Sequence, residues 1–393
     1  MPPLDRVRHS RLDCPPILPA FPVTTIRVLI FHTHAGNGGT EEISRLLQVG
    51  LAARGYAVEE LSFVRATSFR DPATDNSAAV LPQKLGLMAY GRMARFAFSE
   101  IRRRRPDVIL GLQWGGNMLG DIAALFAGSP LMIANQFTPM EFVPAGARWI
   151  DRLQGACGAF SRIVVNSRAV EDGYAAYPGR YRNRLVRIDH GFAQKTSALS
   201  AAQARDAFGL PLGVTLLGSV GRLTRQKNFE AAVRLLTRNA GWHLALAGHG
   251  EEEERLRTLA ASLGCADRLH MPGEIHPDRV GDFLAALDVF VFPTAAETFG
   301  LAVVEAAEAG VPVVAADLPV LREVLAVNGQ ACALFADPED TAGFAQAVSR
   351  LLGDESLRRQ LTEPGRCLTR RYAVEKMIDV YDRLIKAALE ERQ

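Results

Sequence analysis

Residues 288–322, DVFVFPTAAETFGLAVVEAAEAGVPVVAADLPVLR, decide the fold class of this chain. The apolar run 289–292 ends at a proline, which is typical of a buried strand. Residues 300–309 are expected to form a helix that stops at a glycine and a proline. A second apolar strand, 311–315, follows at once. A strand, a loop, a helix and a strand in this order predict a parallel α/β sheet.

Two carboxylates flank the start of the predicted helix. Glu297 lies in the preceding loop, and Glu305 lies inside the helix, about 7.5 Å along its axis at about 1.5 Å per residue. The free N–H groups and the dipole of a helix N-terminus suit a phosphate, and a carboxylate on each side could hold hydroxyl groups. This arrangement fits a nucleoside-diphosphate sugar. The alternative is an ordinary loop acid at Glu297 and an ordinary solvated helix residue at Glu305.

Two cations occur in a second segment, residues 219–236, SVGRLTRQKNFEAAVRLL. A strand ends before Gly221, which permits a sharp turn, and Asn228 is expected to cap the following helix. Arg222 and Lys227 therefore lie at the carboxyl edge of the sheet, where ligands of open α/β sheets bind. Two cations there would neutralise a diphosphate without a metal ion. The alternative is an ordinary basic loop.

The second half of the chain resembles the C-terminal domain of the retaining glycosyltransferases with the GT-B fold, of the family 4 type. Four blocks carry the resemblance: VGRLTRQKNFE from residue 220, LALAGHGEEEERLRTLAASLG from 244, RLHMPGEI from 268, and FPTAAETFGLAVVEAAEAGVPVVAAD from 292. The last block matches the family's Glu-x7-Glu pattern at Glu297 and Glu305. The resemblance implies an α/β fold of two Rossmann-like, doubly wound parallel-sheet domains facing across a cleft. A chain of 393 residues is long enough for two such domains.

The resemblance also implies an activity. A sugar would pass with retention from a nucleoside-diphosphate sugar, a UDP-sugar before a GDP-sugar, to a hydroxyl of a saccharide or lipid-linked acceptor. Arg222 and Lys227 would stabilise the leaving diphosphate, which is usually the largest catalytic contribution. Glu297 would hold sugar hydroxyls and Glu305 the ribose. Further donor contacts are expected at Phe299, Gly300, Leu301, Gly248, Gly250, Gly273, Gly38 and Gly39.

We expect neither a metal ion nor another cofactor, because no Asp-x-Asp pair stands at a predicted strand end. The glycine-rich segment 32–42, HTHAGNGGTEE, follows a first strand predicted over 26–31. It fails the dinucleotide fingerprint because Glu41 replaces the third glycine, and it lacks the lysine of a P-loop. In the resembled family a Gly-Gly turn, here Gly38 and Gly39, lets the backbone approach the donor phosphates and the acceptor. The alternative is a tight turn that needs two small residues.

Three further apolar runs, 108–111, 131–134 and 163–166, continue a doubly wound sheet in the first half of the chain. Many members of the resembled family carry a histidine in the loop after the second run, whereas this chain has Asn135 and Gln136. Glutamine cannot titrate near pH 7, which weakens the assignment of an acid or base in this domain. The candidates for the acceptor side are His34 and Gln136, with His32 and His190 as alternative histidines.

The patterns divide the chain into five parts. These are a loose N-terminal tail, 1–24, without the apolar core of a signal peptide; an N-terminal Rossmann-like acceptor domain, 25–192; an Ala- and Ser-rich linker, 193–213; a C-terminal Rossmann-like nucleotide-sugar domain, 214–370; and an amphipathic C-terminal helix, 371–393. The resemblance implies that this helix crosses back to the first domain.

Charge is unevenly distributed along the chain. Residues 1–190 hold 23 Lys and Arg against 16 Asp and Glu, whereas the remainder holds 22 against 27. Arginines concentrate between Arg92 and Arg105, where they could touch an anionic membrane that carries the acceptor. The alternative is cations at a helix C-terminus, which the helix dipole favours. Nucleic acid is disfavoured as a partner, because the net charge is +2 and no aromatic-plus-basic recognition motif occurs.

No apolar run approaches the roughly 18 residues that suggest a membrane span. The five scattered cysteines have no metal-ligand spacing and fit a reducing cytosol. We therefore expect a cytoplasmic protein, at most peripheral at the inner face of the membrane, and the resembled family commonly serves bacterial polysaccharide or glycolipid synthesis. Two rival functions stay open: a nucleotide-sugar epimerase on the same fold, and a degenerate member that binds a nucleotide sugar without catalysis.

Overall fold

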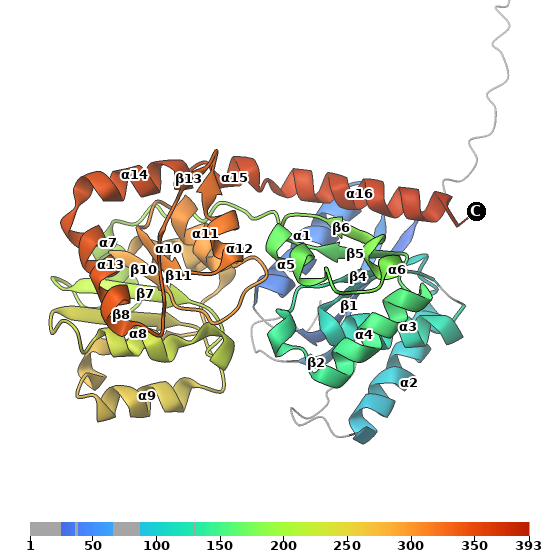
Figure 1. Cartoon of the computed structure of the whole chain (residues 1–393), viewed down its shortest axis with the longest axis horizontal. Coiled ribbons are helices and arrows are strands. Elements are labelled where there is room, and N and C mark those ends of the chain that lie inside the picture. Colours follow the sequence, from blue (N-terminus) through green and yellow to red (C-terminus); the bar gives the residue numbers. More distant parts are fainter. Residues whose placement is uncertain (1–24, 36–37, 66–86, 129, 393) are drawn as a thin grey trace, which may run out of the picture.

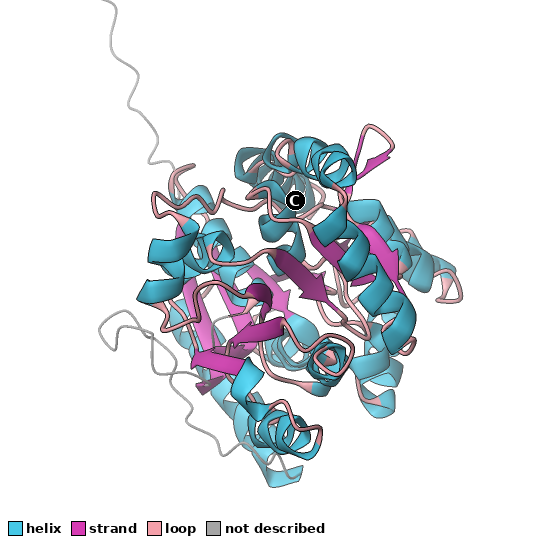
Figure 2. Cartoon of the chain, turned by 90° about the vertical axis from the view of Figure 1, so that its left-hand side faces the viewer, coloured by secondary structure: helices cyan, strands magenta, loops and turns pink. Residues whose placement is uncertain are grey.

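The structure is a computed structural model that describes residues 25–35, 38–65, 87–128 and 130–392. These residues form two parallel six-stranded sheets, each packed between helices (Figure 1; Figure 2). The predicted class, two doubly wound parallel α/β domains, is confirmed. The tail predicted over residues 1–24 lies outside the described residues.

The first sheet has the strand order β2-β1-β3-β4-β5-β6. Its strands are β1 (Arg27–Ala35), β2 (Ala57–Arg65), β3 (Val108–Leu112), β4 (Leu131–Asn135), β5 (Arg162–Val165) and β6 (Leu185–Arg187). The helical elements of this domain are α1 (Gly39–Ala52), α2 (Leu87–Arg104), α3 (Gln113–Phe126), η1 (Met140–Phe142), α4 (Ala145–Cys157), α5 (Arg168–Gly173) and α6 (Gly179–Arg182).

The central strands of the first sheet are apolar because helices cover both of its faces. β3 and β4 are buried at every position. The first strand is longer than predicted, since β1 pairs with β2 as far as Ala35. His32 and His34 therefore lie in the strand and not in the loop after it.

The second sheet has the strand order β14-β11-β10-β7-β8-β9. Its strands are β7 (Thr215–Val220), β8 (Trp242–Ala247), β9 (Leu269–Gly273), β10 (Val289–Phe292), β11 (Val313–Ala316) and β14 (Leu334–Ala336), and β12 (Ala326–Val327) and β13 (Gln330–Ala331) form a separate antiparallel pair. Its helical elements are α7 (Ala201–Ala207), η2 (Arg225–Lys227), α8 (Phe229–Leu235), α9 (Glu253–Ser262), η3 (Ala266–Arg268), η4 (Pro277–Arg279), α10 (Val280–Ala285), α11 (Leu301–Glu308), α12 (Pro319–Val324), α13 (Thr341–Gly353), α14 (Glu355–Gly365) and α15 (Leu368–Arg371).

The final helix, α16 (Val374–Glu390), runs from the second domain along the first (Figure 1). Its apolar face is buried, and its Ile378 fills the space beside Gly50 of α1, where a Cβ atom would lie 2.6 Å from Cγ1 of Ile378. The Tyr381 hydroxyl donates a 2.7 Å hydrogen bond to Oδ1 of Asn135 at the end of β4. The last helix of the chain therefore packs against the first domain.

The arginine-rich segment forms α2, and part of its charge is neutralised within the domain. Arg103 and Arg104 both pair with Glu100, at 2.6 and 3.0 Å, and Arg104 also pairs with Glu59 of β2. None of the helices in the described part of the chain combines the length and the apolar character that crossing a bilayer demands.

Candidate active site

A cavity of about 760 Å³ lies between the two domains, walled mainly by residues that follow the carboxyl ends of the strands. Ten of the residues predicted for catalysis or donor binding line it: Arg222, Lys227, Glu297, Phe299, Gly300, Leu301, Glu305, Gly248, Gly38 and Gly39. The two domains contact each other at its floor, since a Cβ atom on Gly39 would lie 3.3 Å from Cδ1 of Leu301. The residues predicted from the sequence therefore line one cavity, eight of them in the second domain and two, Gly38 and Gly39, in the first.

The N-terminus of α11 forms part of the cavity wall. Gly300 precedes the helix with φ +87°, a left-handed conformation that suits glycine. The first N–H groups of a helix lack intrahelical acceptors, so this end of α11 presents free donors. The loop before it is held by the first domain: Nδ2 of Asn166 donates to Oγ1 of Thr298 at 3.0 Å, and the Ser167 hydroxyl donates to the Thr298 carbonyl at 2.8 Å.

Lys227 and Glu297 form an ion pair. The sequence did not predict this pair, because the two residues lie in separate loops. Nζ of Lys227 lies 2.5 Å from Oε1 of Glu297, and the Thr294 hydroxyl donates to the same oxygen at 3.1 Å. Lys227 reaches this position from η2. The side-chain cap expected from Asn228 is wrong: this residue precedes α8 with a left-handed backbone, φ +48°, and its side chain makes no capping hydrogen bond.

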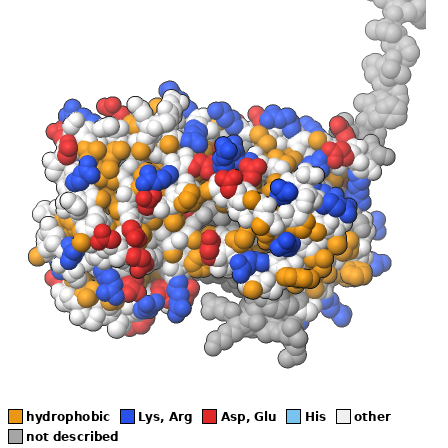
Figure 3. Space-filling view, in the orientation of Figure 1, with side chains coloured by type: hydrophobic (Ala, Val, Ile, Leu, Met, Phe, Trp, Pro, Cys, Tyr) orange, Lys and Arg blue, Asp and Glu red, His pale blue; other side chains and the backbone are white. Residues whose placement is uncertain are grey.

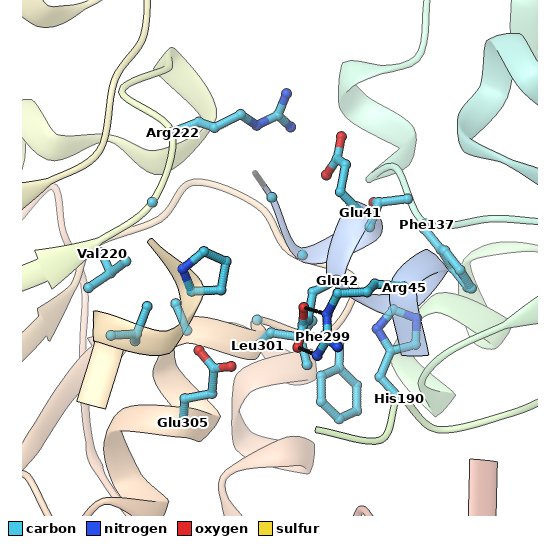
Figure 4. A pocket seen from close by; sticks show the side chains of 18 of the residues that line it. Glu41, Glu42, Arg45, Phe137, His190, Val220, Arg222, Phe299, Leu301 and Glu305 are labelled. Carbon is cyan, nitrogen blue, oxygen red and sulfur yellow. Dashed lines mark hydrogen bonds and ion pairs between the residues drawn. The ribbon is translucent and has the colours of Figure 1, made fainter. Parts of the chain in front are cut away.

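Arg222 differs from Lys227 because it is exposed in the cavity. Within the part of the chain that the structure describes, it has no ion-pair partner. It reaches toward the first turn of α1, which carries Glu41 (Figure 4). A Cβ atom on Gly38 would lie 2.6 Å from Oε2 of Glu41 and 3.7 Å from Nε of Arg222. A glycine at position 38 therefore leaves room for both charged groups.

Glu305 is buried in the wall of the cavity, and burial raises its pKa to about 7, although Lys195 opposes this shift. Nζ of Lys195 lies 3.9 Å from Oε1 of Glu305 and 3.8 Å from Oε1 of Glu42. Glu42 also binds Arg45, with two 2.8 Å hydrogen bonds. The sequence did not identify Lys195 as a site residue. It lies in the segment predicted as a linker, and a single lysine there gives no sign of a role in the cavity.

Gly248 and Gly250 have a packing role that the sequence did not reveal. A Cβ atom on Gly248 would lie 1.9 Å from the carbonyl oxygen of Gly221, and one on Gly250 would lie 2.3 Å from that of Leu223. Both glycines therefore allow two loops to approach each other. Gly250 and Gly273 do not line the cavity, and Gly273 instead accepts a 2.8 Å hydrogen bond from the N–H group of Gly248.

His190 is the described histidine of the first domain that lines the cavity. Burial lowers its pKa to about 3, so the ring is neutral at pH 7. Nδ2 of Asn166 lies 3.2 Å from its Nε2 atom, and its ring packs edge-on against Phe137, with 4.4 Å between the ring centroids. Within the described residues its Nδ1 atom has no hydrogen-bond partner.

The structure does not bring Gln136 to the cavity. Its Nε2 atom donates to Oδ1 of Asp151 at 2.7 Å and to the Tyr181 hydroxyl at 3.0 Å, so the amide is held in a network under α4. The side chain of His34 lies outside the described residues. His32 is buried. Its Nε2 atom lies 2.8 Å from the Ser44 hydroxyl oxygen, within hydrogen-bond distance, and 3.0 Å from Oε1 of Glu60.

Glu41 and Gln113 are cavity residues that the sequence did not indicate. Glu41 is 6% exposed in the first turn of α1, and Oε1 lies 3.5 Å from Nε2 of Gln113. Gln113 opens α3 with φ +66°, a conformation that costs energy for a residue other than glycine. The sequence had shown Glu41 only as a mismatch to a glycine pattern.

Comparisons with known proteins agree with this geometry. Residues 201–367 match the family described as glycosyl transferases group 1. The lipopolysaccharide core biosynthesis glycosyltransferase LpsE of Rhizobium meliloti is 31% identical over 380 residues, which cover 91% of this chain and 98% of that protein. The D-inositol 3-phosphate glycosyltransferase of Acidothermus cellulolyticus is 30% identical over 316 residues, which cover 73% and 68%.

Solved structures agree on the fold. Sucrose-phosphate synthase of Thermosynechococcus elongatus has a TM-score of 0.78 at 19% identity, covering 92% of this chain and all of that one. The Anabaena protein HepE in complex with UDP-glucose has a TM-score of 0.76 at 18% identity, covering 92% and 100%. The resemblance found in the sequence is confirmed: the chain belongs to the group 1 glycosyltransferases and has their GT-B fold.

Proposed function

We propose that this glycosyltransferase moves a sugar from a UDP-sugar, or with second preference a GDP-sugar, to a hydroxyl of a saccharide or glycolipid acceptor, with retention and without a metal ion. One observation carries the proposal. Arg222, the Lys227–Glu297 pair and the N-terminus of α11 converge on the cavity between the domains. The positive charge of Arg222 and of the helix terminus suits a diphosphate, and Lys227 lies beside them while paired with Glu297.

The donor is proposed to lie along the second-domain wall. Glu305 accepts hydrogen bonds from the ribose hydroxyls, and Glu297 accepts them from the sugar. The diphosphate meets the N–H groups at the start of α11, beside Arg222 and Lys227. Because Lys227 and the N–H groups at the start of α11 are held in place before the donor arrives, they stabilise the charge that grows on the diphosphate without reorganising.

The transfer step breaks the bond between the anomeric carbon and the β-phosphate oxygen. The electron pair of that bond stays on the phosphate, which Arg222 and Lys227 stabilise. The acceptor hydroxyl forms the new bond from the same face, and its proton passes to the departing phosphate oxygen. The neutral state of His190 supports this route, because a histidine with a pKa of about 3 is a weak base.

The setting is proposed from the relatives and from the cysteines. LpsE takes its name from lipopolysaccharide core biosynthesis, and we propose a bacterial polysaccharide or glycolipid pathway for this chain. Cys157, Cys265, Cys332 and Cys367 are free thiols. Free thiols are the rule in a reducing cytoplasm, where we place the reaction.

The test is product analysis by proton NMR. The protein is incubated with UDP-glucose, UDP-galactose, UDP-N-acetylglucosamine or GDP-mannose in excess EDTA, with water as the acceptor. We expect one donor to release its nucleoside diphosphate and a free sugar that first appears in the donor's anomeric configuration. An inverted first product, a strict need for a divalent ion, or an epimerised nucleotide sugar without free diphosphate would each contradict the proposal.

A further inference from the structure

Exposed apolar side chains gather on one part of the first domain. Among the described residues, nine large hydrophobic side chains are exposed, and seven of them belong to α3, η1 and α4: Ile122, Leu125, Phe126, Phe142, Trp149, Ile150 and Leu153. The space-filling view shows hydrophobic side chains clustered over these helices (Figure 3). Single exposed apolar residues are ordinary, but a contiguous group marks an interaction surface. We call this surface the α3–α4 face.

Two polar side chains of α4, Asp151 and Gln154, bond to residues of the domain interior. Asp151 accepts hydrogen bonds from Gln136 at 2.7 Å and from Tyr181 at 2.9 Å, and Nε2 of Gln154 donates to Oδ2 of Asp121 at 2.7 Å. Trp149 and Leu153, one turn apart, are 69% and 50% exposed. A surface helix of a globular protein normally turns its apolar stripe to the core. The exposed position of Trp149 and Leu153 indicates that a partner covers the outer side of α4.

The charge of the surface indicates which partner this is. Arg148 and Arg152 lie one turn apart on α4, and both are exposed. The neighbouring α2 adds the exposed Arg92 and Arg95, while Glu141 of η1 is an exposed acid beside the patch. A tryptophan and other apolar side chains flanked by arginines suit the boundary between the acyl chains and the headgroups of an anionic bilayer.

A second copy of the chain fits this surface less well. A twofold dimer brings the two copies of the patch together, which gathers the arginines of α4 from both copies in one interface. Like charges brought together in an interface repel. An anionic lipid surface instead offers phosphate groups to the same arginines.

We propose that the α3–α4 face docks on an anionic lipid bilayer, with its apolar side chains at the acyl boundary and Arg148 and Arg152 at the level of the phosphates. The surface is close in sequence to the active site. Thr138 and Pro139 line the cavity, and Phe142 follows three residues later. A lipid-linked acceptor would therefore meet the first-domain wall. The docking itself does not depend on the proposed donor or reaction.

Tryptophan fluorescence with vesicles tests the docking directly. The chain has three tryptophans, and Trp242 is 4% exposed whereas Trp149 is 69% exposed. We expect vesicles of equal phosphatidylglycerol and phosphatidylcholine to shift the emission to the blue and to pellet the protein. The substitution Trp149→Phe should abolish most of the blue shift while the protein still pellets.

The triple variant Phe126→Ser, Trp149→Ser, Leu153→Ser should bind these vesicles at least tenfold more weakly than the wild type. Leu212→Ser is the matched control, because Leu212 is 62% exposed outside the face, and it should bind like the wild type. The variant Arg148→Ala, Arg152→Ala should lose the preference for phosphatidylglycerol over pure phosphatidylcholine. Melting temperature and far-UV circular dichroism confirm that each variant is folded.

Two outcomes would overturn the proposal. The first is a folded triple variant that pellets with the vesicles as well as the wild type does. The second is a wild-type dimer in sedimentation velocity that the triple variant lacks, combined with no vesicle binding by either protein. That second result would assign the α3–α4 face to a subunit interface.

Discussion

The two walls of the cavity are electrically different. The second-domain wall combines the cations Arg222 and Lys227 and the free N–H groups of α11 with the carboxylates Glu297 and Glu305. The first-domain wall has the carboxylates Glu41 and Glu60, the Glu42–Arg45 ion pair and the neutral ring of His190. Under the proposed function, the diphosphate binds Arg222, Lys227 and the start of α11 on the second-domain wall. Carboxylates and neutral polar groups suit the hydroxyls of a sugar. Under the proposed function, the cations and the helix N-terminus of one domain hold the leaving group, and the acceptor approaches along the other domain.

The strongest test of this asymmetry removes a cation from the second-domain wall. Arg222→Ala should lower turnover about 10²–10³-fold, because one cationic donor to the developing anion is lost. The readout is release of nucleoside diphosphate at saturating donor. Arg225→Ala is the matched control, since Arg225 is 80% exposed in its side chain and pairs with Glu252 outside the cavity. Equal turnover in Arg222→Ala and the wild type would remove Arg222 from the mechanism.

Glu305 provides the next largest effect, on stability. Its folded pKa of about 7 lies above the ordinary value of 4.5, so the folded protein holds this proton more tightly than the unfolded chain does. Stability should therefore fall as pH rises from about 4.5 to about 7 and remain lower above that range. Glu305→Gln removes the charge, and we expect it to stabilise the unliganded protein by roughly 2–3 kcal/mol at pH 8.

Urea unfolding at pH 5 and pH 8 measures this difference. The gain from Glu305→Gln should be much smaller at pH 5, where Glu305 of the folded wild type is already protonated. The same substitution should weaken nucleoside-diphosphate binding at pH 8, because a carboxylate is a stronger acceptor for ribose hydroxyls than an amide. An equal gain at both pH values would show that Glu305 does not titrate near 7.

Gly300 tests how the N-terminus of α11 is built. Gly300→Ala should destabilise the protein by about 1–2 kcal/mol, because alanine resists the left-handed conformation, and a Cβ atom would lie 3.1 Å from Leu321. Gly146→Ala in α4 is the control, since a Cβ atom there meets open space, and it should not destabilise. The melting temperature compares them, and equal values for the two variants would show that the loop does not require glycine.

The smallest effect is expected on the first-domain wall. His190 is neutral across the physiological range because burial lowers its pKa to about 3. The ratio of wild-type to His190→Asn turnover should therefore stay constant between pH 5 and pH 8. A ratio that changes through pH 6.5 would assign a titrating role to His190 and make the two walls more alike.

The second-domain wall was readable from the sequence because its parts are local. Glu297, Gly300 and Glu305 fall within one loop and one helix, and Arg222 and Lys227 fall within another loop, so strand and helix signals were enough to place them. The pairing of Lys227 with Glu297 was missed, since it joins two loops that are distant in the sequence.

The first-domain wall was harder to read because its site residues come together only through tertiary contacts. Gln136 follows β4 as expected, yet the hydrogen bonds that its amide donates to Asp151 and Tyr181 turn it away from the cavity. Lys195 reaches Glu305 from a segment that reads as a linker. The local sequence pattern predicts neither the orientation of the Gln136 amide nor the contact between Lys195 and Glu305.

Thermal unfolding with nucleotides in excess EDTA tests the proposal that the second-domain wall binds a nucleoside diphosphate through side-chain and helix charge. UDP, GDP, ADP and CMP are each compared on the wild type and on Arg222→Ala. At 100 times its dissociation constant a ligand adds about 2.7 kcal/mol, and at roughly 2–4 °C per kcal/mol the melting temperature should rise by about 5–10 °C. We expect UDP to give this rise in the wild type and a smaller one in Arg222→Ala. No rise with any nucleotide, or a rise that appears only when a divalent ion replaces EDTA, would contradict the account.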